Sequence, residues 1–77
     1  MNTQAAPFGA MLRRWREQRR LTQQDLADLI YVTRQTVIAI EGDKYSPSLE
    51  VAFRIAHVFS VPLEQVFQYH APTKRGR

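Results

Sequence analysis

The stretch that decides the fold is Leu21–Lys44, LTQQDLADLIYVTRQTVIAIEGDK. Thr22 and Asp25 have the spacing of a capping box, which predicts that a helix begins after Thr22. Thr33 is a good capping residue for a second helix, in which apolar residues recur at the i, i+3 spacing of a buried stripe. Only two residues connect the helices, and so short a connection makes them cross at a steep angle.

The first turn of this second helix carries Arg34, Gln35 and Thr36, which all have hydrogen-bond donors or acceptors. When one helix is held across another in this way, its first turn points outward. The base pairs of DNA display complementary donors, acceptors and methyl groups in the major groove. The stretch therefore predicts a surface that contacts DNA bases, with the rest of the chain supporting it.

Three more helices are predicted around this pair, which makes the fold class all-α. Leu12 and Trp15 share one face of a first helix that is otherwise rich in arginine. Gly42 predicts the end of the helix that follows Thr33, and Pro62 suits the first turn of the last helix. One domain at 10–70 is expected between a flexible arm at 1–9 and a basic disordered tail at 71–77, with helices at 10–20, 23–30, 34–41, 49–59 and 62–70.

The composition fits one small cytoplasmic domain. A chain of 77 residues is the size of a single domain. It has no cysteine, which excludes disulfides and cysteine-ligated zinc and agrees with a reducing cytosol. No apolar run reaches the ~18–20 residues of a membrane span, and the chain does not start like a signal peptide. The apolar face of the first helix is too small for a role at a membrane surface.

An enzymatic function is not expected. The groups with potential for chemistry are His57, His70, Ser46 and Ser48, together with scattered acidic residues. Their spacing matches neither a Ser/His/Asp triad nor a metal-ligand cluster, and the chain has no glycine-rich phosphate loop. We therefore expect no catalytic residue, no metal and no cofactor.

Positive charge is concentrated at the two ends of the chain, whose formal net charge is +4. Residues 1–20 contain five arginines and one glutamate, and residues 73–77 add three basic residues. Residues 21–72 contain three basic and six acidic residues. A basic chain is compatible with nucleic-acid binding. Two interpretations of the first-helix arginines stay open, a solvated face and contacts to DNA phosphates.

The whole pattern resembles the lambda repressor/Cro-like (Xre-type) helix-turn-helix family of transcriptional regulators. The resemblance rests on Trp15-Arg16, LTQQDLA at 21–27, VTRQTVIAIE at 32–41, KYSPSL at 44–49 and the helix pair that ends near Phe67. It implies a compact five-helix domain whose third helix enters the major groove. It also implies a homodimer bound to two-fold related half-sites.

The resemblance also assigns roles to individual residues. An arginine suits guanine and a glutamine suits adenine, and the base contacts implied on the third helix are Arg34, Gln35, Thr36 and Ala39. The last of these can offer only an apolar contact to a thymine methyl. The phosphate contacts implied around the helix pair are Gln23, Thr33, Lys44, Tyr45 and Arg16. Finally, the family implies a structural ion pair between Arg16 and Glu41 that holds the third helix in place.

Three residues depart from the family pattern, which commonly has glycine at the positions of Arg20, Tyr31 and Asp43. A residue other than glycine costs about 1 kcal/mol where the backbone has a positive φ. Aspartate tolerates this conformation best of the three, and tyrosine fits worst. The turn between the second and third helices is therefore where the match to the family is weakest.

Together these observations predict a sequence-specific DNA-binding transcriptional regulator, and more specifically a repressor of its own or neighbouring genes. The expected partners are double-stranded DNA with a two-fold symmetric operator and a second copy of the chain. Val66, Phe67 and Tyr69 of the last helix form the predicted pairing surface. The alternative is a protein-interaction or antitoxin-type module of the same fold, with weak or no specific DNA binding and a partner such as a toxin.

Overall fold

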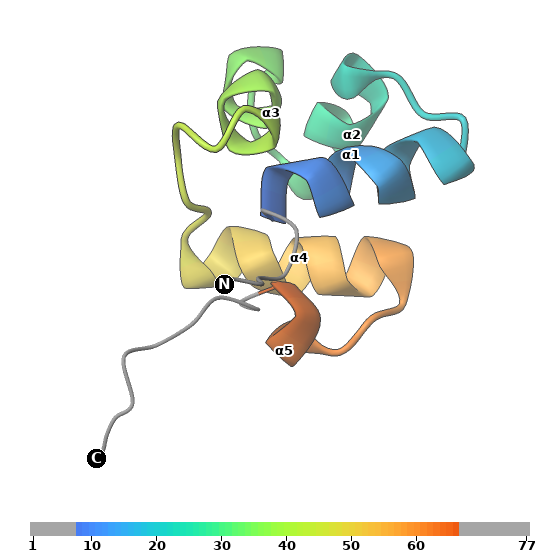
Figure 1. The fold of residues 1–77 in the computed structure, drawn as a ribbon, viewed down its shortest axis with the longest axis vertical. Helices are drawn as coiled ribbons and strands as arrows, with labels where there is room; N and C mark the ends of the chain where they lie inside the picture. The colour runs from blue at the N-terminus through green and yellow to red at the C-terminus, as the bar shows by residue number, and fades with distance from the viewer. Residues whose placement is uncertain (1–7, 67–77) are drawn as a thin grey trace, which may run out of the picture.

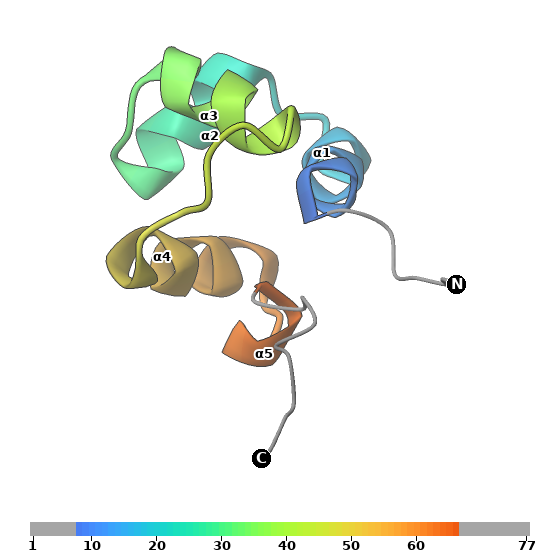
Figure 2. The same cartoon turned by 60° about the vertical axis from the view of Figure 1, so that its left-hand side comes forward.

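The computed structural model describes residues 8–66, and this part of the chain is all-α, as predicted. Helices α2 and α3 lie on one side of α4, and the short α5 lies on the other side (Figure 1). Figure 2 shows the same order and places α1 beside the α2–α3 pair. The helices are α1 (Phe8–Gln18), α2 (Gln23–Ile30), α3 (Arg34–Glu41), α4 (Leu49–Phe59) and α5 (Leu63–Val66).

Both helices of the central stretch have the predicted bounds because their caps form as the sequence indicates. The hydroxyl of Thr22 accepts a hydrogen bond from the backbone N–H of Asp25, and the Asp25 carboxylate accepts one from the N–H of Thr22, both at 2.9 Å. Thr33 likewise accepts from the N–H of Thr36 at 3.2 Å. These bonds satisfy N–H groups that a helix cannot satisfy internally.

Helix α1 begins two residues earlier than Ala10, the predicted start, so Phe8 and Gly9 belong to the helix and not to the arm. Gly9 is buried against the end of α3, where an added Cβ would lie 2.4 Å from the carbonyl oxygen of Glu41. Its N–H donates to a carboxylate oxygen of Asp43 at 2.9 Å. The start of α1 and the end of α3 are therefore fixed together. The rest of the predicted arm and the tail lie outside the described residues.

Four helices end in the same backbone motif, in which a residue other than glycine adopts the left-handed conformation. The N–H of the next residue then donates to a carbonyl five positions back, which closes the helix end. The three positions at which the sequence departs from the family's glycines, Arg20, Tyr31 and Asp43, do have positive φ, and Ser60 is a fourth residue of this kind. Gly42 itself has φ −90°, so the left-handed residue after α3 is Asp43. The four residues are Arg20 (φ 58°), Tyr31 (61°), Asp43 (59°) and Ser60 (56°), with bonds Leu21→Arg16, Val32→Ala27, Lys44→Ala39 and Val61→Ala56.

The core lies between the α2–α3 pair and α4, and all five helices contribute to it. Trp15 of α1 packs against one side of this core. Its ring centroid lies 6.2 Å from that of Phe8 and 5.7 Å from that of Phe59. Such a small domain depends on burying nearly every large apolar residue that faces inward. The buried residues are Leu12, Leu26, Ala27, Ile30, Val37, Ile40, Val51, Ala52, Ile55, Ala56, Phe59 and Val66.

Candidate nucleic-acid interface

The first turn of α3 is free of other parts of the domain. Arg34 and Gln35 are exposed, and neither side chain forms a hydrogen bond or ion pair with another residue of the described region. Thr33 and Thr36 differ, because their hydroxyl oxygens lie 3.1 Å apart and bond to one another. Two long polar side chains therefore project from the start of α3 with their donors and acceptors available.

The last turn of α3 is fixed by a buried ion pair with α1. Arg16 Nε lies 2.7 Å from Glu41 Oε2 and Nη2 lies 3.2 Å from Oε1, while Nη1 donates to the carbonyl of Leu21 at 2.8 Å. The two side chains are 10% and 5% exposed. The pKa of Arg16 is raised, mainly by its hydrogen bonds to Glu41, although desolvation opposes the shift. Because the guanidinium is directed inward, we do not retain the expected phosphate contact of Arg16.

Gln23 connects α2 to the Arg16–Glu41 ion pair between α1 and α3. Its side-chain Nε2 donates to Glu41 Oε1 at 3.3 Å, so the carboxylate of Glu41 joins α1, α2 and α3. The side-chain amide of Gln23, one of the groups expected to meet a phosphate together with the backbone N–H groups, is thus turned toward the protein. The N–H of Asp25 in the first turn of α2 is used by the cap at Thr22, but those of Gln23 and Gln24 have no partner within the helix and remain suited to an anion.

An open depression lies between α1, the start of α2 and the outer face of α3. Its lining includes Gln24 and Ile38, which the sequence argument did not assign to the site, and Arg13, one of the first-helix arginines whose role the sequence left open. The position of Ile38 has a simple sequence signal, because it lies one helical turn after Arg34 and therefore on the same face. The depression is lined by Arg13, Arg16, Leu21, Thr22, Gln23, Gln24, Arg34, Ile38, Glu41 and Gly42.

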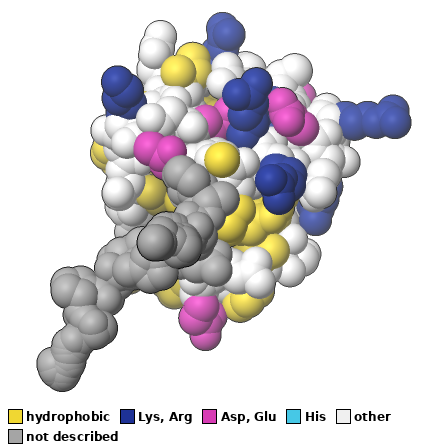
Figure 3. Space-filling view, viewed as in Figure 1, with side chains coloured by type: hydrophobic (Ala, Val, Ile, Leu, Met, Phe, Trp, Pro, Cys, Tyr) yellow, Lys and Arg dark blue, Asp and Glu magenta, His cyan; other side chains and the backbone are white. Residues whose placement is uncertain are grey.

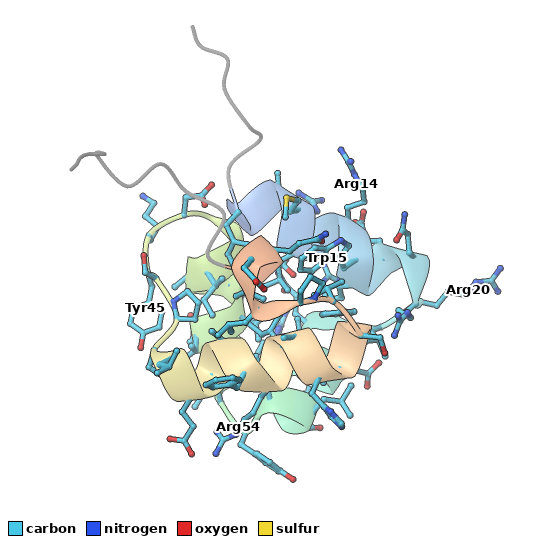
Figure 4. All side chains as sticks on the ribbon, turned by 90° about the horizontal axis from the view of Figure 1, so that it is seen from below. Arg14, Trp15, Arg20, Tyr45 and Arg54 are labelled. Atoms are coloured by element: carbon cyan, nitrogen blue, oxygen red, sulfur yellow. The ribbon has the colours of Figure 1, made fainter. Side chains whose placement is uncertain are left out.

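The five arginines of the first helix region have different surroundings. Arg13 lines the depression and pairs with Glu17 at 3.3 Å. Arg19 stabilises the end of α4, where it donates to the carbonyls of Val58 and Phe59 and lies 5.4 Å from the Phe59 ring centroid. Arg14 and Arg20 project into solvent (Figure 4). Of these arginines, Arg13 is the one placed to meet a ligand beside α3.

The opposite end of α3 leads into an exposed loop that contains Lys44 and Tyr45. The backbone N–H of Lys44 donates to Ala39 at 2.8 Å, which fixes the path of the chain and leaves the lysine side chain exposed. Figure 4 shows Tyr45 at the side of the molecule opposite Arg20. In Figure 3, Lys and Arg side chains are spread over the half of the molecule formed by α1, α2 and α3, with acidic side chains among them.

Comparison with known proteins matches nearly all of the described region. The helix-turn-helix family model HTH_3 matches residues 12–66. The chain belongs to the lambda repressor/Cro-like (Xre-type) helix-turn-helix family. It is therefore a DNA-binding transcriptional regulator in class, as the central stretch predicted.

Two relatives of this helix-turn-helix regulator come from different organisms. It is 52% identical over 58 residues to the HTH-type transcriptional regulator MJ0272 of Methanocaldococcus jannaschii, covering 75% of this chain and 88% of the relative. It is 48% identical over 46 residues to the HTH-type transcriptional regulator YgzD of Bacillus subtilis, covering 60% of this chain and 70% of YgzD. These relatives are named as regulators and not as enzymes.

A solved structure supports the same architecture. The restriction-modification controller protein C.AhdI from Aeromonas hydrophila superposes with a TM-score of 0.72 and 28% sequence identity. The match covers 79% of this chain and 92% of the controller protein. Within residues 8–66 no helix is long and apolar enough to cross a membrane.

Proposed function

We propose that this helix-turn-helix regulator is a sequence-specific repressor that reads the major groove of DNA with α3. The observation that carries the proposal is the free pair Arg34 and Gln35 on a helix whose other end is anchored by Glu41. A base contact needs side chains that are available and a backbone that holds them in one register. Both requirements are met at the start of α3.

The proposed base contacts follow from the chemistry of each side chain. The guanidinium of Arg34 can donate two hydrogen bonds to guanine O6 and N7, and the amide of Gln35 can pair with adenine N6 and N7. Thr36 and Ala39 are half-buried, so each offers the groove little more than a methyl group. Specificity is therefore assigned mainly to Arg34 and Gln35, with weaker contributions from the two smaller residues.

The proposed phosphate contacts surround these base contacts. Backbone N–H groups at Gln23 and Gln24 form the start of α2, and Arg13 lies beside them in the depression. Lys44 and Tyr45 extend from the loop after α3. Thr33 keeps the phosphate role that the resemblance implies, through a hydroxyl that already caps α3. Contacts to phosphates would set the register of α3 without contributing sequence information.

We propose that two copies bind a two-fold symmetric operator, with their α3 helices about 34–36 Å apart in successive major grooves. Val66 cannot belong to the pairing surface because it is buried in the core at 3% exposure. Phe67 and Tyr69 lie outside the described residues. The exposed apolar side chains Leu49 and Phe53 are one turn apart on α4, and we place the pairing surface there. A bound pair would repress by occupying DNA that the transcription machinery needs.

Selection of bound sequences from a random DNA pool tests this function. We expect a two-fold symmetric motif that contains guanine and adenine in each half-site. Affinity for that motif should fall linearly with salt on a log–log plot, because phosphate contacts release counterions. A pool that shows no enrichment at low salt would contradict the proposal and favour the protein-interaction or antitoxin-type alternative.

A further inference from the structure

A large, exposed apolar side chain, Ile38, lies within the polar surface proposed to contact DNA. Ile38 is 39% exposed and lines the same depression as Arg34 and Gln24. Its neighbours Val37 and Ile40 are almost fully buried in the core. Ile38 therefore belongs to the outer face of α3 and not to the packing that holds α3 on the domain.

We propose that Ile38 contacts the C5-methyl group of a pyrimidine in the major groove, an inference that rests on the proposed function. The C5-methyl of thymine is the apolar feature that distinguishes base pairs in this groove, and 5-methylcytosine presents the same group at the same ring position. An exposed branched side chain can bury such a methyl without any polar group losing a partner. Ile38 offers a larger apolar surface for this purpose than the half-buried Ala39.

The helix geometry places this methyl relative to the base contacted by Arg34. Four residues of α-helix rise about 6 Å, and successive base pairs are stacked about 3.4 Å apart along the duplex. Arg34 and Ile38 lie on one face of α3, so their targets are within about two base-pair steps of one another. Each half-site should therefore contain a guanine and a C5-methyl pyrimidine at that separation.

Synthetic operators test the inference one methyl group at a time. In the selected motif, each thymine is replaced by deoxyuridine, which removes only the methyl group. Burial of one such group corresponds to an affinity change of about fourfold per half-site. We expect this loss at one symmetric thymine for the wild-type protein and little or no loss for Ile38→Ala. The matched control is Leu29→Ala, because Leu29 is an exposed apolar residue of α2 outside the depression and should leave the dependence on the methyl intact.

A second pair of operators distinguishes the two sources of the methyl group. Cytosine and 5-methylcytosine are compared at the same position. A thymine effect assigns the contact to unmodified DNA, and a 5-methylcytosine effect without a thymine effect assigns it to methylated DNA. A selected motif that binds equally well without any of these methyl groups would overturn the Ile38 contact alone. The same holds if Ile38→Ala keeps the full methyl dependence. Failure to select any motif would instead overturn both this inference and the proposed function.

Discussion

The two ends of α3 differ in how their polar side chains are satisfied. At the first turn, Arg34 and Gln35 make no side-chain hydrogen bond within the described region. At the last turn, the carboxylate of Glu41 accepts hydrogen bonds from Arg16 and Gln23 and is nearly inaccessible to solvent. One eight-residue helix thus has an anchored end and a free end. Together with the proposed function, this difference would place stability at the last turn of α3 and recognition at the first.

This separation has a physical basis. A buried ion pair adds little net stability when compared with apolar residues, but it requires a specific geometry, and removal of one partner leaves a buried charge. An ion pair of this kind fixes the orientation of α3 on the domain. An exposed arginine, in contrast, can be removed without a cost to packing. Substitutions at the two ends should therefore have opposite effects on folding and on DNA binding.

The largest expected effect is the loss of the anchor. Glu41→Ala leaves the guanidinium of Arg16 buried without its counterion, and we expect the free energy of unfolding to fall by about 3–5 kcal/mol. Urea denaturation followed by circular dichroism measures this value. Glu50→Ala is the matched control, because Glu50 also pairs with an arginine but is largely exposed, and it should cost no more than about 1 kcal/mol. Equal effects of the two substitutions would remove the distinction between an anchored end and an ordinary surface pair.

A second substitution tests the same end of α3 from the side of α1. Gly9→Ala would bring a Cβ to 2.4 Å from the Glu41 carbonyl, and we expect a destabilisation of about 1–3 kcal/mol from the forced displacement. Gly42→Ala is the control. A Cβ added there would lie 3.3 Å from its nearest neighbour, the carbonyl oxygen of Ile38, and the φ of Gly42 is −90°. Thermal unfolding of both variants measures the difference. If Gly9→Ala unfolds at the wild-type temperature, the close approach of α1 to α3 is not present in solution.

The free end should behave in the opposite way. Arg34→Ala is expected to reduce affinity for the selected operator by about 1–3 kcal/mol and to change affinity for random DNA little. Its thermal stability should match that of the wild type, because Arg34 is exposed and makes no side-chain bond within residues 8–66. Arg14→Ala provides the control for general loss of positive charge, since Arg14 projects into solvent from α1 (Figure 4). Equal losses on both kinds of DNA would assign Arg34 to a phosphate.

The smallest expected effect concerns Arg20, which follows α1. Arg20 has φ 58° and its side chain projects into solvent. Arg20→Gly should therefore raise the free energy of unfolding by up to about 1 kcal/mol. The same change at Arg14, inside α1, should lower it by about 1 kcal/mol because glycine disfavours the helix interior. Chemical denaturation should show that the free energy of unfolding changes with opposite sign in the two variants. A change of the same sign would contradict the left-handed conformation of Arg20.

The sequence predicts well the features that depend on neighbours along the chain. The caps at Thr22 and Thr33 fix the bounds of α2 and α3, and three of the four left-handed positions follow from the family pattern. Among the contacts between distant segments, the Arg16–Glu41 ion pair was implied by the family resemblance and is confirmed, but other contacts of this kind were not predictable. Gly9 lies inside α1 because of its contact with the end of α3, and Val66 is buried by tertiary packing.

The candidate site follows the same rule. Arg34 and Gln35 were predicted from the first turn of α3, where local helix geometry decides their direction. The amide of Gln23 was expected on a phosphate, but a tertiary contact turns it to Glu41. Ile38 was not assigned to the site, and the role of Arg13 stayed open, because their relation to the depression depends on how α1, α2 and α3 pack.

The most direct test of the free end of α3 combines Arg34→Ala with a change of one atom in the operator. Replacement of the conserved half-site guanine by 7-deazaguanine removes the N7 acceptor and leaves base pairing intact. We predict that each change alone weakens binding and that 7-deazaguanine has no further effect once Arg34 is alanine, because Arg34→Ala has already removed the hydrogen bond to N7. Independent, additive losses would contradict a base contact by Arg34 and with it the assignment of recognition to the first turn of α3.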